Sequence, residues 1–235
     1  MPSVLLHPLG LDGASWRYLG LDAVAPDFAG HGARVSTPAM SLPAMAAEVA
    51  ASLEEPADLV GISMGGVVAQ VIALEWPQRV RSLVLACTTS ASSPQTLQAR
   101  AEAARSQTPE ETADELIDRW FPGAGTPGLR ARIDAAVRPP LLASSPEVKA
   151  ACWEAIGTHQ ATERLREIDV PVTLIAGARD SPGPNERMGP MRERLARSRL
   201  IVLDCGHMPQ ISLPEELRAA IEAHRQWVRE ETTSL

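Results

Sequence analysis

The sequence has little of what marks several large classes of protein. Only 3% of its 235 residues are aromatic, and the formal net charge is −7. Nucleic acids and anionic membranes attract clustered Lys and Arg, so this acidic balance argues against both as partners. No segment reaches the roughly 18 apolar residues of a membrane span, and no basic run followed by an apolar stretch opens the chain. We therefore expect a cytoplasmic protein.

Cysteine is also scarce. The three cysteines, Cys87, Cys152 and Cys205, are an odd number and lack the C-x-x-C spacing. They therefore predict neither a disulfide framework nor a zinc cluster. We expect free thiols in a reducing compartment, and no metal or organic cofactor.

What the sequence does contain is an alternation of short apolar runs with longer helical segments. Gly, Pro or Asp bounds the apolar runs, and this pattern is typical of a parallel sheet covered by helices. We expect buried strands at residues 4–6, 59–62, 83–86, 172–175 and 200–203, a weaker one at 22–25, and helices at 43–53, 65–75 and 215–230.

The alternation breaks between residues 90 and 167. Helical patterns at 96–105 and 110–120 are followed there by a Pro- and Gly-rich stretch at 122–128. The length of the chain suits one core with an inserted subdomain. We interpret residues 90–167 as a helical cap, and residues 1–89 and 168–235 as an α/β core. The core is expected to have a mostly parallel sheet of about six strands, with helices on both faces.

The segment Gly61-Ile62-Ser63-Met64-Gly65 follows an apolar run and opens a helical one. A turn sharp enough to expose a serine hydroxyl between strand and helix crowds the backbone two residues to either side, and glycine relieves this crowding. The helix N-terminus also offers backbone N–H groups to a developing oxyanion, with Met64 N–H as the natural donor. The pattern predicts a nucleophilic Ser63. The alternative is a simple helix N-cap.

His207 and Asp180 are the predicted partners of Ser63. Each lies in a loop after an apolar run, so both are expected at the carboxyl edge of the sheet. A base at this edge can take the serine proton, and a carboxylate can hold the imidazole tautomer and stabilise the imidazolium. The alternatives are a structural histidine and a turn aspartate, or an aspartate that pairs with Arg179.

Five short motifs, spread over nearly the whole chain, together resemble those of a known family. They are residues 7–10 (His-Pro-Leu-Gly), 27–32 (Asp-Phe-Ala-Gly-His-Gly), 61–65, 177–180 (Gly-Ala-Arg-Asp) and 206–207 (Gly-His). With these motifs and the order Ser, Asp, His, the chain resembles the α/β-hydrolase family. It looks most like the small ester and lactone hydrolases of that family, such as the 3-oxoadipate enol-lactonases. The resemblance implies an α/β-hydrolase fold and a second oxyanion donor, the N–H of Leu9.

The chain departs from the family pattern in two places. Pro8 stands where relatives usually have glycine, which stiffens the loop that carries Leu9. In the family, an antiparallel hairpin often precedes the strand that leads into the Leu9 loop. Here that strand, residues 4–6, is the first apolar run, so the hairpin is expected to be missing. By the same resemblance, His7 and His31 are interpreted as structural.

These residues predict a serine hydrolase that cleaves a small carboxylic ester or lactone through an acyl-enzyme. Two alternatives stay open: the same triad used for C–C bond cleavage, cyclisation or acyl transfer, and a ligand receptor with little turnover. A small-molecule substrate is the expected partner of a monomer or homodimer. The predicted pocket consists of large apolar side chains, namely Trp16, Trp120, Phe121, Trp153, Met188 and Met208.

Overall fold

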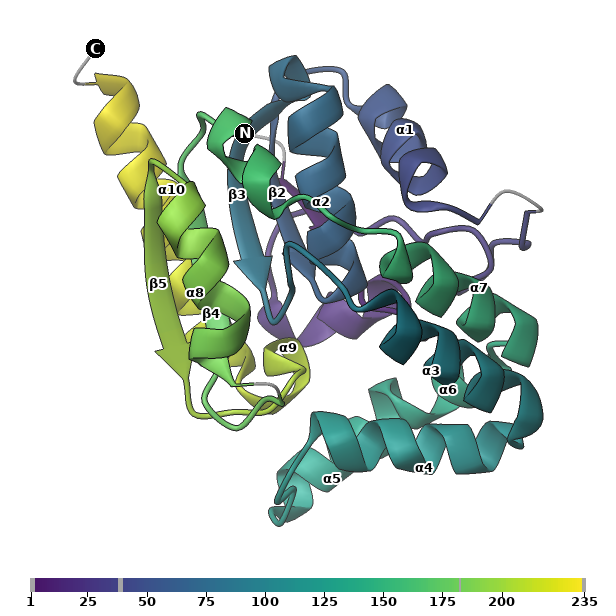
Figure 1. The fold of residues 1–235 in the computed structure, drawn as a ribbon. Coiled ribbons are helices and arrows are strands. Elements are labelled where there is room, and N and C mark those ends of the chain that lie inside the picture. The colour runs from purple at the N-terminus through teal and green to yellow at the C-terminus, as the bar shows by residue number, and fades with distance from the viewer. Residues whose placement is uncertain (1–2, 38–39, 182, 234–235) are drawn as a thin grey trace.

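The computed structural model describes residues 3–37, 40–181 and 183–233. Within these ranges the centre of the molecule is a sheet of five parallel strands in the order β1-β2-β3-β4-β5 (Figure 1). All five strong apolar runs form strands, as predicted. The strands are β1 (Ser3–Leu6), β2 (Ala57–Ile62), β3 (Val80–Ala86), β4 (Val172–Gly177) and β5 (Ser198–Leu203).

The two edges of the sheet differ from the prediction of buried strands. The weak run at 22–25 makes a one-residue parallel bridge, in which Val24 N–H donates to Ser3 O (2.9 Å) and Leu5 N–H donates to Val24 O (2.8 Å). Val24 is 65% exposed, so this segment buries too little apolar surface to hold a longer strand. β5 forms the opposite edge, where Val202 is 51% exposed.

The chain reverses its direction across the sheet at β1. From β1 it crosses to Val24 on one side, and it then returns to β2 on the other side. In open parallel sheets, ligand sites lie beside the carboxyl ends of the strands at such a switch point. The loop after β1 and the turn after β2 are therefore where the topology predicts a site.

Helices cover both faces of the sheet, as predicted (Figure 1). The helices α1 (Leu42–Ser52), α2 (Met64–Glu75) and α8 (Pro184–Arg194) pack on one face. On the other face lie α10 (Pro214–Thr233) and the 3-10 helix η1 (Gly13–Leu19). None of the helices in the described ranges is both long and apolar enough to cross a bilayer.

Five further helices lie between β3 and β4. They gather toward the end of the sheet to which the strands point, where α3 packs along α7 and α4 packs against α6 (Figure 1). The division into a core and a cap at residues 90 and 167 stays a prediction. The helices are α3 (Pro94–Ser106), α4 (Pro109–Trp120), α5 (Pro127–Ala136), α6 (Arg138–Ala143) and α7 (Pro146–Gly157).

Serine or threonine followed by proline begins four of these helices. Ser93, Thr108, Thr126 and Ser145 each accept a hydrogen bond from the backbone N–H three residues on, and proline takes the first helical position. Such residues satisfy N–H groups that a helix start leaves without partners, and proline has no N–H to satisfy. α5 and α7, which the apolar spacing did not predict, thus carry a local sequence signal.

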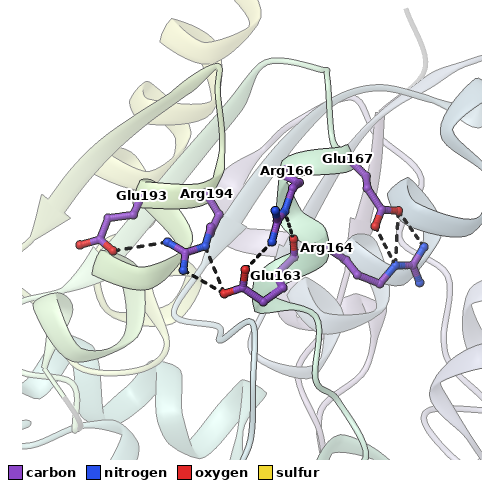
Figure 2. A network of polar contacts seen from close by, with 6 residues as sticks. All are labelled: Glu163, Arg164, Arg166, Glu167, Glu193 and Arg194. Atoms are coloured by element: carbon purple, nitrogen blue, oxygen red, sulfur yellow. Dashed lines mark hydrogen bonds and ion pairs between the residues drawn. The ribbon is translucent and has the colours of Figure 1, made fainter.

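The chain returns to β4 through the 3-10 helix η3 (Thr162–Glu167). Glu163 of η3 contacts Arg194 of α8 at 2.9 Å, as Figure 2 shows, and Arg164 contacts Glu75 of α2 at 2.6 Å. Exposed pairs of this kind add little to stability, so they mark where η3 lies between the two helices more than they stabilise it.

One charged side chain is buried in α7. Lys149 is 1% exposed, and among the described residues its Nζ has no hydrogen-bond partner. Burial lowers the pKa of this amine from its ordinary 10.5, and the charge of Glu110 opposes the shift. Because an ammonium group without a partner is costly to remove from water, Lys149 should destabilise the fold.

We expect Lys149→Met to raise the melting temperature by several degrees at pH 7, since methionine fills similar space without a charge to desolvate. The pKa of Lys149 is lower in the folded state, so the unfolded state binds more protons as pH approaches 10.5 from below. Stability of the wild type therefore rises with pH in this window, and the gain from methionine should shrink.

Calorimetry at pH 7 and pH 10 measures both effects. Lys149→Arg keeps a buried charge and is the control that should not stabilise. A melting temperature for Lys149→Met that is no higher than wild type at pH 7 would contradict the interpretation.

Candidate active site

The turn between β2 and α2 holds Ser63 in a conformation that side chains rarely adopt. Its φ is 52° and its ψ is −117°. Ser63 N–H donates to Ala86 O (3.0 Å), and Thr88 Oγ1 donates to the Ser63 carbonyl oxygen (2.8 Å). Strain of this kind costs about 1–3 kcal/mol and persists only where the surroundings enforce it. Here β3 and the loop after it enforce the conformation of Ser63 through these two hydrogen bonds.

Glycine is required on both sides of Ser63. A Cβ on Gly61 would lie 2.4 Å from the Gly65 carbonyl oxygen, and a Cβ on Gly65 would lie 2.0 Å from the Leu6 carbonyl oxygen. Any larger side chain would therefore push α2 away from the strands. The predicted crowding is present, and it brings the start of α2 against the end of β1.

The side chains of His207 and Asp180 meet Ser63 at the carboxyl edge of the sheet. His207 Nε2 lies 3.0 Å from Ser63 Oγ, and His207 Nδ1 lies 2.7 Å from Asp180 Oδ2. The imidazole and the carboxylate are 9% and 6% exposed, so little water competes for these hydrogen bonds. An Nδ1–H that donates to Asp180 leaves Nε2 as an acceptor for the serine hydroxyl.

Local contacts orient the Asp180 carboxylate. Ser181 N–H donates to Asp180 Oδ1 at 2.8 Å, which leaves Oδ2 to face His207. Arg179, the alternative partner, instead pairs with Asp204 at 3.2 Å. Asp180 therefore belongs to the hydrogen-bonded group with His207 and Ser63.

A helix outside the sheet sets the position of His207. Trp120 ends α4, and its carbonyl oxygen accepts a hydrogen bond from His207 N–H (2.9 Å). The Trp120 ring stacks with the imidazole at a centroid distance of 6.4 Å and an interplanar angle of 27°. A Cβ on Gly206 would lie 2.3 Å from the same carbonyl oxygen, which explains the glycine before His207.

The two predicted oxyanion donors belong to neighbouring elements at this edge. Met64 is the first residue of α2, so its N–H has no acceptor within the helix. Leu9 lies in the loop after β1, and the close approach of Gly65 to the Leu6 carbonyl brings that strand against α2. The end of β1 and the start of α2, which lead into the segments of the two predicted donors, therefore lie side by side.

Two buried histidines brace the loop that carries Leu9. Phe28 N–H donates to His7 Nε2 (3.0 Å), and Gly10 N–H donates to His31 Nε2 (3.2 Å). Burial, with the charge of His31 adding to it, lowers the pKa of His7 to about 3, and burial lowers the pKa of His31 as well. Both shifts favour the neutral rings that these N–H groups need as acceptors.

Ser63 and His207 line a cavity of about 280 Å³. This volume is at the small end of the roughly 300–1,000 Å³ typical of ligand pockets, so it suits a small molecule. The helices α3 and α4 contribute Arg100 and Arg119 to the lining. The apolar wall consists of Met64, Val67, Leu97, Trp120, Trp153 and Ile156.

The cavity contains part of the predicted pocket. All six predicted residues are buried in the hydrophobic core, and Trp120 and Trp153 also line the cavity, whereas the other four do not. Large apolar side chains become buried wherever they pack, so residue type alone did not separate the two groups. Sequence reasoning also missed Arg100 and Arg119, two cations on the inserted helices of an acidic chain. The four predicted residues that do not line this cavity are Trp16, Phe121, Met188 and Met208.

Within the described part of the chain, Cys87, Asp180 and His207 carry metal-ligating atoms that lie within 4.8 Å of one another. Asp180 Oδ2 and both ring nitrogens of His207 take part in the hydrogen bonds to each other and to Ser63. An ion bound by all three residues would have to break these bonds. The arrangement therefore suits proton transfer along the side chains better than metal coordination.

Comparison with known proteins finds relatives that span most of the chain. The chain is 31% identical over 207 residues to 3-oxoadipate enol-lactonase 2 of Acinetobacter baylyi, covering 84% of this chain and 76% of that relative. It is 31% identical over 242 residues to a pimeloyl-[acyl-carrier protein] methyl ester esterase of Aeromonas hydrophila, covering 93% of each.

Among solved structures, a thermophilic esterase from Thermogutta terrifontis superposes with a TM-score of 0.86 at 27% identity, covering 98% of this chain and 90% of the other. Residues 4–220 match the model of the alpha/beta hydrolase family. With that match over most of its length, the chain belongs to the α/β-hydrolase family.

Proposed function

We propose that the chain is a serine hydrolase that cleaves a small carboxylic ester or lactone through an acyl-enzyme. The observation that carries the proposal is the pair of hydrogen bonds that links Asp180, His207 and Ser63 beside a small cavity. The enol-lactonase and the methyl ester esterase among the relatives support the type of bond cleaved.

Ser63 is the nucleophile of the first step. As Ser63 Oγ attacks the carbonyl carbon of the substrate, His207 Nε2 accepts the hydroxyl proton. The imidazole becomes an imidazolium, and the Asp180 carboxylate beside Nδ1 stabilises this charge. Because few water molecules reach the pair, the stabilisation is stronger than it would be at the surface.

The negative charge that develops on the carbonyl oxygen needs donors already in position. The N–H of Met64 at the start of α2 and the N–H of Leu9 in the braced loop supply them. Removing one such donor typically lowers the rate about 100-fold or more. The strained turn at Ser63 serves both nucleophilic attack and oxyanion stabilisation. It exposes the hydroxyl, and it begins the helix whose first N–H is the donor.

Collapse of the intermediate breaks the carbon–oxygen bond of the ester. The His207 imidazolium gives its proton to the leaving alkoxide, which departs as an alcohol or, from a lactone, stays attached to the acyl chain. His207 then takes a proton from water, and the resulting hydroxide attacks the acyl carbon. As the bond between that carbon and Ser63 Oγ breaks, His207 returns the proton to Oγ. The products are a carboxylic acid and regenerated Ser63.

A fluorophosphonate should add covalently to the wild type and not to Ser63→Ala, as intact-protein mass spectrometry would measure. The wild type should cleave short p-nitrophenyl esters, and Ser63→Ala should lower kcat by about 10⁴-fold or more. Ser92→Ala, which changes another serine of the cavity, should still be labelled. Failure to label the wild type would contradict the role of Ser63. Labelling without turnover of any ester or lactone would contradict ester hydrolysis.

Asp180→Asn should lower kcat by up to about 10⁴-fold with little change in KM, because asparagine favours the wrong imidazole tautomer. Steady-state kinetics with a p-nitrophenyl ester measure this effect. Asp204→Asn is the matched control, since Asp204 lies close by and pairs with Arg179 at the surface. A loss smaller than about tenfold for Asp180→Asn would show that this carboxylate does not orient the base.

The rate should also depend on pH. A protonated His207 cannot accept the serine proton, so kcat/KM should fall as the pH is lowered from 7 toward 5. Burial lowers the pKa of His7 to about 3 and the pKa values of His159 and His224 to about 4. These three rings stay neutral in that range, so the loss of activity is not theirs.

Stability must be measured at the same pH values. The pKa values of His7, His159 and His224 are lower in the folded state than the ordinary 6.5, so the unfolded state binds more protons below pH 6.5. The stability that these three neutral rings contribute is therefore fully present above pH 6.5 and is lost progressively toward pH 4. Melting temperatures separate this loss from the loss of rate. A flat rate profile from pH 5 to 9 would remove His207 from its role.

A further inference from the structure

We propose that Arg100 and Arg119 recognise an anionic group of the substrate in the cavity beside Ser63. The inference rests on the proposed function and deepens it. The substrate class it names is a small ester or lactone that carries a carboxylate away from the bond that is cleaved.

Both arginines lie where a bound molecule would reach them. Arg100 is on α3 and Arg119 is on α4, and both line the cavity that also contains Ser63 and His207. The cavity measures only about 280 Å³, so a molecule that fills it contacts the serine hydroxyl at one end and the arginines elsewhere on the wall.

Both guanidinium groups contact the ring of Trp153. The guanidinium carbon of Arg100 lies 5.1 Å from the centroid of the Trp153 ring, and that of Arg119 lies 5.4 Å from it. Cation–π contacts form within about 6 Å of a ring centroid. An arginine over a ring keeps its N–H donors at the edge of its plane, in the fork that matches a carboxylate. Such side chains lose less freedom when an anion binds.

The charge of the cavity favours an anion. Its charged lining residues are Arg100, Arg119, Asp180 and His207, of which Asp180 and His207 hydrogen bond each other. Two positive charges on the wall of the cavity attract an anion, and partial burial strengthens this attraction.

The kinetic test compares mono-p-nitrophenyl glutarate with p-nitrophenyl pentanoate, which has the same acyl length without the charge. The wild type should have the higher kcat/KM for the glutarate ester. The ratio of the two values should fall about tenfold in Arg100→Gln or Arg119→Gln and about 100-fold in the double variant, mainly through KM. Replacement by lysine, which keeps the charge and loses the fork, should cause a smaller fall.

A second pair of esters places the carboxylate on the alcohol side. Comparison of 4-carboxyphenyl acetate with phenyl acetate reports which half of the substrate the arginines hold. A preference for the anionic ester in either pair, lost in the double variant, supports the inference.

Arg105→Gln is the matched control. Arg105 lies on the same helix as Arg100, but its side chain is 44% exposed and pairs with Glu154 at 2.7 Å. Its replacement should leave both rates unchanged. Melting temperatures of all variants identify any that fold poorly, because a purely structural contact with Trp153 would lower stability without changing the ratio between anionic and neutral esters.

Binding is measured separately, so that the outcome does not depend on turnover. Glutarate is titrated calorimetrically into Ser63→Ala, and adding the double arginine substitution should weaken its binding at least about tenfold. Arginine-dependent binding without ester turnover by the wild type would overturn the proposed function and keep this inference. Ester turnover with neither an anionic preference nor arginine-dependent glutarate binding would overturn this inference and keep the proposed function.

Discussion

The close approach of α2 to β1 and β2 is the constraint on which the whole site depends. It forces Ser63 to positive φ, and it requires glycine at positions 61 and 65, where a Cβ would lie 2.0–2.4 Å from backbone oxygens. The same turn exposes the hydroxyl and begins the helix whose first N–H, that of Met64, has no partner within the helix. The proposed nucleophile and the proposed oxyanion donor are therefore fixed relative to each other by one piece of backbone, whose strain the packed core and the hydrogen bonds to β3 offset.

The base is held from two sides. The Asp180 carboxylate approaches His207 from a loop of the sheet, whereas the Trp120 carbonyl and ring approach it from the end of α4. The inserted helices thus do more than cover the cavity, because one of them positions the imidazole. A shift of α4 would move the wall of the cavity and the base together, which couples the fit of a ligand to the geometry of proton transfer.

Average charge and local charge differ in this molecule. The chain carries a net charge of −7, and yet the cavity beside Ser63 is lined by two arginines over one tryptophan. Electrostatic effects at a site depend on the few charges within several ångströms and on how well water screens them. The core accordingly holds the hydroxyl, carboxylate and amide groups that suit acyl transfer, while the inserted helices α3 and α4 supply the charge that favours one kind of ligand.

The sequence determined the five strands and most of the long helices and, together with the resemblance to the α/β-hydrolases, predicted the three residues that meet at the carboxyl edge. It could do so because strand ends, glycine spacing and helix starts depend on backbone sterics that act over a few neighbouring residues. Only the tertiary structure decided which large side chains face the cavity. Trp120 and Trp153 do so, whereas Trp16 and Met188, which belong to the same hydrophobic core, do not line it. That choice, like the arginine pair, depends on how helices distant in sequence pack against one another, and no local pattern records it.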